Sequence, residues 1–523
     1  MKHSHRAVKL AVAAAATAIA LTSLSACSTG SEEPAGERGA LLTVQFSGVP
    51  ISLNPALAGT GGSTVFTYLN YDPLIYRAGD GELLPDLATE WEYLDEENTQ
   101  LELTIREGVK FQDGTELDAH AVAGSMNYFL SAGGPALGDI GPVESVEAID
   151  DDTVVVTYST SFPYGPERLT QYQMIGLIIA PAGVADPDSL LTQPNGTGQY
   201  LYNADESVAE SSYVYDRNPD YWNPEAQQYE RIVVQVIGDP TAVVSAATTG
   251  QVDFASGNPD TAKTAADAGL TILQAPFFNW GITILDREGT LVPALADQNV
   301  RQAIAHAIDR EAVANARGAD FAHPSGQVAN AGVPGYIDGY GFDFDLAKAK
   351  ELMAQSAYPD GFSMTLVSDA VLDSQSAIAQ TAIANLAEIG IQVELQVEAA
   401  VPSFIQAAGS KEYPAALWPI VGLRASEPAS LIIGPGFLNA FQVGDDRLAA
   451  LIADANVGTE EERDAKQDAV TERSNEIAYF IPVVATDSIF MVSSKIENVT
   501  ISAINSNPVP IGPDAAHAWR PAR

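Results

Sequence analysis

The sequence is short of cysteine, histidine and basic residues. It has one cysteine and six histidines in 523 residues, and its 26 lysines and arginines stand against 68 aspartates and glutamates, which gives a formal net charge of −42. A single thiol excludes an internal disulfide and a multi-thiolate zinc site. Nucleic-acid binding needs cations that displace phosphate counterions, so we expect no nucleic-acid partner. At roughly 100–200 residues per domain, the length predicts two to four domains.

Motifs of common enzymes are also missing. The histidines beyond residue 27 are widely spaced: His120, His306, His323 and His517. None of them belongs to a His-Glu-x-x-His metal helix, and the chain has no Gly-x-Ser-x-Gly elbow. We therefore expect no metal, no cofactor and no enzymatic activity.

The first 26 residues have the pattern of an export signal. Three cationic residues precede the run 10–21, in which Thr17 is the only residue that is not apolar. This run is too short to cross a ~30 Å hydrocarbon core, which needs about 20 residues, but it suits the apolar core of a signal peptide. We predict that residues 1–26 are removed on export. No later segment offers a comparable uninterrupted run, so we expect no spanning helix.

The signal ends in Leu24-Ser25-Ala26-Cys27, which resembles a bacterial lipobox. The resemblance implies that Cys27 is diacylated and anchors the protein on the outer face of the cytoplasmic membrane. The alternative is a lone buried cysteine, but the neighbouring residues are small and polar. Two acyl chains, at about 0.8 kcal/mol per buried methylene, hold a protein on a membrane without a spanning helix. Residues 27–39 are small, polar and charged, and we expect them to form a flexible tether.

From residue 42 onwards the chain has the periodicities of a globular protein. Alternating apolar residues predict strands over 42–46, 101–105, 362–366 and 391–397, and a β-branched run predicts another over 154–157. Asp80-Gly81, between two apolar runs, predicts a hairpin. Helices are expected over 345–353 and 374–388, where each helix is followed by a strand. This alternation predicts an α/β fold with an open sheet, in which ligands collect beyond the carboxyl ends of the strands.

A further helix is predicted over 297–315. Val300, Ile304 and Ile308 follow one another at steps of four and form a stripe that faces the core. Arg301 and Asp309 lie on the same helix. We expect them to form surface or interdomain ion pairs rather than to act as catalytic groups.

Two longer motifs are typical of one family. Residues 70–91 read NYDPLIYRAGDGELLPDLATEW, and residues 103–117 read LTIREGVKFQDGTEL. They resemble the signature of extracytoplasmic solute-binding protein family 5, the peptide and nickel class of bacterial ABC importers. Further matches follow in the family's order: GTGQY at 196–200, RNPDYW at 217–222, AATTGQVDF at 246–254 and VRQAIAHAIDR at 300–310. Together these motifs cover the chain from residue 42 to about residue 500.

The resemblance implies an α/β, two-lobed periplasmic-binding-protein clamshell of type II-like form, with an extra domain inserted in the first lobe. Mapped onto this chain, the first lobe comprises 40–78, 186–285 and 486–523, the inserted domain 79–185 and the second lobe 286–485. The chain then crosses between the lobes near residues 285 and 485, where we expect hinges. A solute drives closure only by contacting the closed state better than the open one.

The function that the resemblance implies is that of a lipid-anchored, monomeric receptor of an ABC importer. It would capture a short peptide or peptide-like solute between its lobes and deliver it, unconverted, to permease and ATPase subunits. Two alternatives remain open. The same family fold could carry a non-peptide anionic solute or a metal chelate, or the chain could be a secreted, lipid-anchored hydrolase.

Arg424 is a candidate ligand-binding residue. Glu427-Pro428 is similar to the acidic-proline step that follows the family's ligand loop. In oligopeptide-binding members an aspartate three positions before that step receives the peptide's terminal ammonium, but in this chain Arg424 stands there. A guanidinium would repel an ammonium and attract a carboxylate or phosphate. The alternative is that Arg424 points to solvent or pairs with Glu427.

Three further residues are candidates for the solute site. Trp418 stands on the same loop, and Asn279 and Trp280 lie just before the first expected crossing. They could supply aromatic faces and an amide to the solute. Each also has a plain packing alternative.

Overall fold

The computed structural model describes residues 40–523, except residues 60, 371 and 374–375. Residues 1–26, Cys27 and the rest of the segment 27–39 lie outside the described residues, so the signal peptide, the lipid anchor and the tether stay predictions. Within the described part of the chain, each helix is either too short or too polar to serve as a membrane span.

The largest sheet has 11 strands and mixes parallel with antiparallel pairs. Its order is β15-β14-β16-β12-β17-β11-β1-β10-β9-β8, and β13 pairs with β17. The strands are β1 (Leu41–Phe46), β8 (Tyr200–Val208), β9 (Ser212–Arg217), β10 (Arg231–Val236), β11 (Phe254–Ser256), β12 (Thr271–Ile284), β13 (Ala322–Pro324), β14 (Phe362–Asp369), β15 (Ile391–Glu398), β16 (Ala415–Ile420) and β17 (Phe480–Val492). The predicted α/β class is confirmed, and β15 forms one edge of the sheet.

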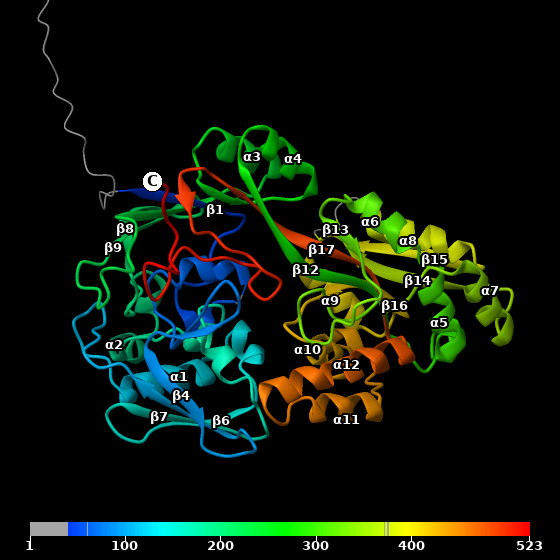
Figure 1. The fold of residues 1–523 in the computed structure, drawn as a ribbon, viewed down its shortest axis with the longest axis horizontal. Helices are drawn as coiled ribbons and strands as arrows, with labels where there is room; N and C mark the ends of the chain where they lie inside the picture. Colours follow the sequence, from blue (N-terminus) through cyan, green and yellow to red (C-terminus); the bar gives the residue numbers. More distant parts are fainter. Residues whose placement is uncertain (1–39, 60, 371, 374–375) are drawn as a thin grey trace, which may run out of the picture. The chain divides into compact units, whose positions relative to one another are not determined.

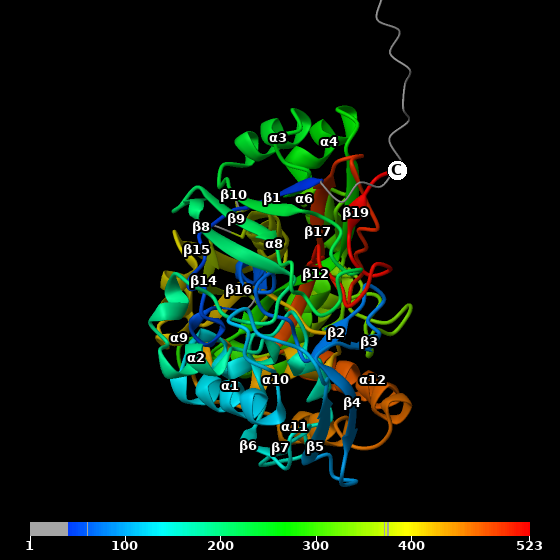
Figure 2. The ribbon, with the colours of Figure 1, turned by 90° about the vertical axis from the view of Figure 1, so that its left-hand side faces the viewer.

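Helices pack around the strands of this sheet and of a second, smaller sheet (Figure 1, Figure 2). They are α1 (Ala119–Ala132), α2 (Pro181–Ala185), α3 (Pro240–Thr248), α4 (Pro259–Asp267), α5 (Gln298–Ala307), α6 (Arg310–Arg317), α7 (Leu346–Gln355), α8 (Ala377–Ala387), α9 (Val401–Gly409), α10 (Ser426–Ile433), α11 (Asp446–Asp454) and α12 (Glu460–Ile477). The helix expected from residue 345 is confirmed as α7, and Asp345 caps it by accepting a hydrogen bond from the Lys348 backbone N–H.

Two long strands, β12 and β17, run antiparallel beside each other (Figure 1). The first half of β12 pairs with β17 near β11, and its second half also pairs with β16. The register between β12 and β17 shifts between Pro276 and Phe278 and again between Trp280 and Gly281. The crossings predicted near 285 and 485 therefore fall on or next to paired strands, while the lobe boundaries stay a prediction.

A second, four-stranded sheet lies in the segment 79–185. Its order is β4-β5-β7-β6, with β4 (Ala88–Tyr93), β5 (Gln100–Ile105), β6 (Val143–Ala148) and β7 (Thr153–Tyr158). Helix α1 packs on it; the Asp118 carboxylate caps the helix, which ends at Gly133 in the left-handed conformation. The predicted hairpin is formed by β2 (Ile75–Arg77) and β3 (Leu83–Pro85). The last pair is β18 (Ile496–Glu497) with β19 (Arg520–Pro521).

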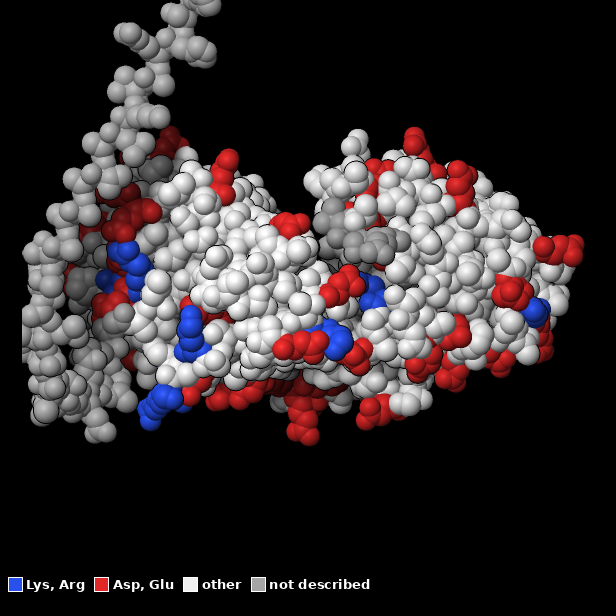
Figure 3. Space-filling model, turned by 90° about the horizontal axis from the view of Figure 1, so that it is seen from above, with Lys and Arg blue, Asp and Glu red and all other residues white. Residues whose placement is uncertain are grey.

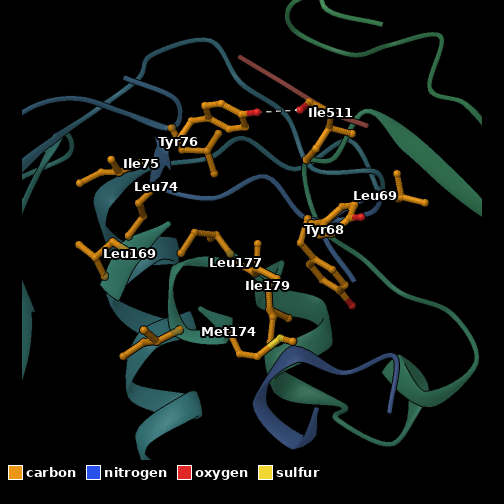
Figure 4. Packing of buried hydrophobic residues seen from close by; sticks show 14 of the residues in the cluster. Tyr68, Leu69, Leu74, Ile75, Tyr76, Leu169, Met174, Leu177, Ile179 and Ile511 are labelled. Carbon is orange, nitrogen blue, oxygen red and sulfur yellow. Dashed lines mark hydrogen bonds between the residues drawn. The ribbon is translucent and has the colours of Figure 1, made fainter. Parts of the chain in front are cut away.

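One core joins segments that are far apart in the sequence. Figure 4 shows side chains from 68–76, from 169–179 and Ile511 in contact, and the Tyr76 hydroxyl donates a hydrogen bond of 3.0 Å to the Ile511 carbonyl. Burying a large apolar side chain contributes about 1.5–3 kcal/mol. The segment 79–185 and the two ends of the described chain therefore stabilise each other.

The helix predicted over 297–315 is two helices. α5 ends at Ala307 and α6 begins at Arg310, because the Asp309 carboxylate caps α6 by accepting a hydrogen bond of 3.0 Å from the Ala312 backbone N–H. The prediction that Arg301 forms an ion pair is wrong. Its guanidinium is buried and donates to the carbonyls of Leu295, Ala296 and Ile477. These three carbonyls lie where helices end, so they have no helical N–H partner. They accept hydrogen bonds from Arg301 in place of the expected carboxylate.

A buried carboxylate gives the fold a predictable pH dependence. Asp72 is fully buried and accepts hydrogen bonds of 3.2 Å from the Tyr221 hydroxyl and the Trp222 indole N–H. Burial raises its pKa to about 6. In an unfolded chain an aspartate titrates near 3.9, so between about pH 4 and pH 6 the folded state binds the extra proton. Stability therefore falls as the pH rises through this window.

The variant Asp72→Asn should lack this pH dependence of stability, because an amide does not titrate. We expect urea unfolding to show that the stability of the wild type relative to Asp72→Asn decreases as the pH rises from about 4 to 6. A difference that stays constant over the whole range would contradict a raised pKa of Asp72.

Acidic side chains outnumber basic ones on the visible surface (Figure 3), as the composition requires. Because charges of one sign repel, this surface favours solubility and gives little attraction to anionic partners.

Candidate functional site

A cavity of about 590 Å³ is lined by residues from distant parts of the chain. We call it the cleft cavity. Its walls come from the segments 138–173, 421–456 and 503–507, together with Arg77, Phe277, Asn330 and Val333. Binding sites for small ligands usually enclose about 300–1,000 Å³ and combine apolar walls with a few polar groups. The cleft cavity has both properties.

Five charged side chains lie at one side of this cavity. We call them the charge cluster: Arg77, Glu167, Arg168, Arg424 and Glu427. Arg424 Nη1 lies 2.6 Å from Glu427 Oε1, and Arg424 Nη2 lies 2.5 Å from Glu167 Oε1. Arg168 pairs with Glu427 at 3.2 Å, and Arg77 with Glu167 at 3.5 Å. The cluster therefore joins the 3₁₀ turn η4 (Pro166–Leu169) to the start of α10.

The cluster keeps Glu427 ionised. Burial alone would raise the pKa of this carboxyl, but the guanidinium groups of Arg424 and Arg168 hold it below its ordinary value. The Leu423 backbone N–H also donates to the carboxylate, at 2.9 Å. Three donors thus fix the orientation of Glu427 where it borders the cleft cavity.

Arg424 has its charge balanced within the protein. It is 8% exposed, it pairs with Glu167 and Glu427, and its guanidinium lies 3.8 Å from the centre of the Tyr164 ring. It borders a separate cavity of about 550 Å³, which we call the side cavity. An anionic solute would have to compete with two carboxylates for this guanidinium.

The other three sequence candidates pack against protein side chains or backbone; Trp280 and Asn279 are buried, and Trp418 is half-buried. Trp280 is 2% exposed and donates its indole N–H to Thr486 Oγ1 at 3.1 Å. The Trp418 ring stacks on Phe404, with ring centres 4.4 Å apart. Asn279 is 1% exposed and donates to the carbonyls of residues 327 and 328. Neither these three nor Arg424 is among the described residues that line the cleft cavity.

Metal binding has no evident place in the described part of the chain. No three or more histidine, cysteine, aspartate or glutamate side chains gather there in an arrangement that could hold an ion.

Comparison with known proteins identifies the family. The family model of bacterial extracellular solute-binding proteins, family 5 (middle), matches residues 82–432. The chain belongs to this family. A Brucella ovis protein, provisionally named an ABC transporter peptide-binding protein, is 28% identical over 324 residues, which is 59% of this chain and 58% of that protein. This chain thus matches a little over half the length of the curated Brucella relative.

Solved structures share the fold of this family 5 protein. The ABC transporter substrate-binding protein CtaP from Listeria monocytogenes superimposes with a TM-score of 0.78 at 21% identity, covering 93% of this chain and 100% of that one. NikA from Brucella suis, solved in complex with Fe(III)-EDTA, gives a TM-score of 0.76 at 21% identity and covers 92% and 100%. The predicted family and the two-lobed binding-protein fold are confirmed.

The family 5 site contains polar groups that the sequence did not reveal. Four buried atoms that have no hydrogen-bond partner among the described residues belong to side chains lining the cleft cavity: Arg168 Nε, Gln173 Oε1, Asn330 Oδ1 and Asn456 Oδ1. The Asn330 amide is oriented by its Nδ2, which donates to the Phe277 carbonyl at 2.9 Å. None of the four residues belongs to a motif, so no sequence signal marks them. These four atoms are themselves shielded from solvent, so it is the other parts of these side chains that border the cavity.

Proposed function

We propose that this protein is the substrate-binding component of an ABC importer that takes a short peptide or peptide-like solute into the cleft cavity. It delivers the solute unchanged to permease subunits, and ATPase subunits supply the energy. In this proposal the acylated Cys27 holds a monomer on the outer face of the cytoplasmic membrane. The two predicted lobes close on the solute, which is released without chemical conversion.

The observation that carries the proposal is the combination of polar groups at the cleft cavity. Amide side chains line the cavity, among them those of Gln173, Asn330 and Asn456, and an amide carries both N–H donors and a carbonyl acceptor. A peptide main chain offers both kinds of group in regular alternation. The volume of about 590 Å³ suits a ligand of that size. The name of the Brucella relative also favours a peptide.

We further propose that Arg424 is a positioning residue. It holds Glu427 and Glu167 in place and does not read the solute directly, because both carboxylates already occupy its guanidinium. Asn279 has a comparable role. Its hydrogen bonds to the carbonyls of Gln327 and Val328 fix the loop that carries Asn330 to the cleft cavity.

To test the proposed function, we compare tripeptide binding by the wild type with binding by a variant whose cleft cavity is partly filled. Leu431 lines this cavity and is 54% exposed, so Leu431→Trp fills part of the cavity without altering the core. A tripeptide pool at about 100 times its Kd should stabilise the wild type by about 2.7 kcal/mol in a thermal unfolding assay. We expect Leu431→Trp to weaken tripeptide binding about tenfold or more, because the solute must be displaced or reoriented.

Leu191→Trp is the matched control. Leu191 is 46% exposed and does not line the cleft cavity, so this variant should bind tripeptides like the wild type. Fe(III)-EDTA is tested in parallel, because NikA was solved with it. A shift with the chelate and none with peptides would assign the protein to chelates, and peptide cleavage seen by mass spectrometry would contradict binding without conversion.

A further inference from the structure

A second, smaller cavity adjoins the cleft cavity. It encloses about 240 Å³, and we call it the aromatic chamber. Its aromatic walls are Phe46, Tyr68, Phe254, Phe277, Phe490 and Trp519. We propose that the solute carries a bulky apolar side chain that enters this chamber while its polar main chain stays in the cleft cavity. This inference rests on the proposed function and adds the class of side chain that is selected.

The chamber offers no partner for a charge. Among the described residues that line it there is no aspartate, glutamate, lysine, arginine or histidine. The amide of Gln45 is already paired, since its Nε2 donates to the Ile237 carbonyl at 2.7 Å and its Oε1 accepts from the Ser256 backbone N–H at 3.0 Å. A charged side chain placed here would lose its hydration and find no opposite charge among the described lining residues. An apolar one would gain about 25 cal/mol for each Å² of surface removed from water.

The chamber also has the size and rigidity that an aromatic side chain needs. An apolar cavity of about 150 Å³ in another protein stays dry and binds benzene, so a chamber of about 240 Å³ accommodates a larger group. Its walls brace each other. Phe254 stacks on Phe490 with ring centres 4.9 Å apart, and its ring lies 4.5 Å from the Trp519 ring. Binding therefore costs little rearrangement of these side chains.

Phe277 connects the chamber to the cleft cavity. It lines both cavities, as do Ser506 and Asn507. Phe277 is the extra residue of a bulge in β12: its neighbours Pro276 and Phe278 pair with consecutive residues of β17, and Phe277 has no pairing partner there. Bulges of this kind redirect a side chain next to binding sites. The Phe277 carbonyl is held by Asn330, so the polar wall and the apolar chamber meet at one residue.

The experiment compares tripeptides that differ in one side chain. The probes are Ala-Ala-Ala and tripeptides with Phe, Glu or Lys at each of the three positions in turn. Titration calorimetry on the wild type should show that the best Phe peptide binds about tenfold or more tightly than the Glu and Lys peptides of the same position. Ala-Ala-Ala should fall between them, because it leaves the chamber empty.

Filling the chamber tests its role directly. Val65 lines the chamber, and Val65→Trp should abolish the preference for Phe while Ala-Ala-Ala binds within about threefold of wild type. Val208→Trp, on the surface strand β8 where Val208 is 58% exposed, is the matched control and should keep the preference. If circular dichroism shows that Val65→Trp is unfolded, Phe277→Ala replaces it; this variant removes the shared wall and should reduce the preference for Phe.

The outcomes separate the two proposals. Tripeptides that bind equally whatever their side chain, or a Phe preference that survives both Val65→Trp and Phe277→Ala, would overturn the chamber while peptide binding stands. Failure of the wild type to bind any of the tripeptides would overturn both proposals.

Discussion

Arg287→Met should lower the free energy of unfolding by at least about 3 kcal/mol. Arg287 is 3% exposed, and no carboxylate pairs with it among the described residues. Its guanidinium instead donates to four backbone carbonyls and to Asn439 Oδ1: Ile284 at 2.9 Å, Ile432 at 2.7 Å, Leu438 at 2.9 Å, Val443 at 2.5 Å and Asn439 at 2.9 Å. Methionine keeps the stem of the side chain but leaves these buried acceptors without donors.

Urea unfolding measures this loss, and Arg447→Met is the control. Arg447 is 66% exposed and pairs with Glu476 at 3.2 Å, so its replacement should cost less than about 1 kcal/mol. A similarly small effect for Arg287→Met would mean that the carbonyls find water or other donors. The substitution should also loosen the segment 432–443, because Arg287 is what ties its carbonyls to the end of β12.

Glu427→Gln should cost about 2–4 kcal/mol of stability at neutral pH. Removing the charge of Glu427 leaves the guanidinium groups of Arg168 and Arg424 with Glu167 as the remaining carboxylate of the charge cluster. Because the cluster joins η4 to the start of α10 beside the cleft cavity, we also expect Glu427→Gln to raise the Kd for tripeptides about tenfold or more.

The pH dependence of the destabilisation shows whether the loss of the Glu427 charge causes it. Since the pKa of Glu427 is lowered in the folded protein, its contribution is present above the unfolded value of about 4.3 and is lost as the pH falls through the folded pKa. The difference between wild type and Glu427→Gln should therefore shrink in acid. Glu206→Gln, which removes the 54% exposed partner of Arg231, should cost less than about 1 kcal/mol at every pH.

A double-mutant cycle checks that the cluster acts as a unit. Arg424→Met combined with Glu427→Gln should destabilise the protein less than the sum of the two single changes, by about 0.5–3 kcal/mol. Additive effects would mean that the ion pair at 2.6 Å contributes nothing of its own.

Local periodicity predicted the elements whose side chains alternate between core and solvent. The strand over 101–105 was predicted because Leu101, Leu103 and Ile105 alternate with polar residues, and the structure buries these three. The helix over 297–315 was predicted as one element because Val300, Ile304 and Ile308 follow one another at steps of four up to the residue before Asp309. Whether Asp309 stays in a helix or caps a new one depends on the packing around it, which periodicity does not contain.

The candidate site was less predictable because its parts meet only after folding. The sequence pointed to Arg424 and its neighbour Glu427, but Glu167 lies 257 residues away from Arg424 along the chain. No motif connects the two. Asn330 and Gln173 are single polar residues without a pattern, so only the folded chain shows that they border one cavity. The aromatic chamber likewise combines residues from both ends of the described chain.

The edge strand β15 affects how neighbouring copies of the protein contact one another. Its exposed positions carry Gln392, Glu394, Gln396 and Val397, and β14 is its single neighbour among the described strands of the sheet. An unpaired edge can template the addition of the same strand from another molecule. An antiparallel pair of two copies centred on Glu394 would bring the two Glu394 carboxylates together, and like charges facing each other across a strand pair oppose this register. The Glu394 carboxylate therefore opposes edge-to-edge addition in that register, even where many copies lie close together on a surface.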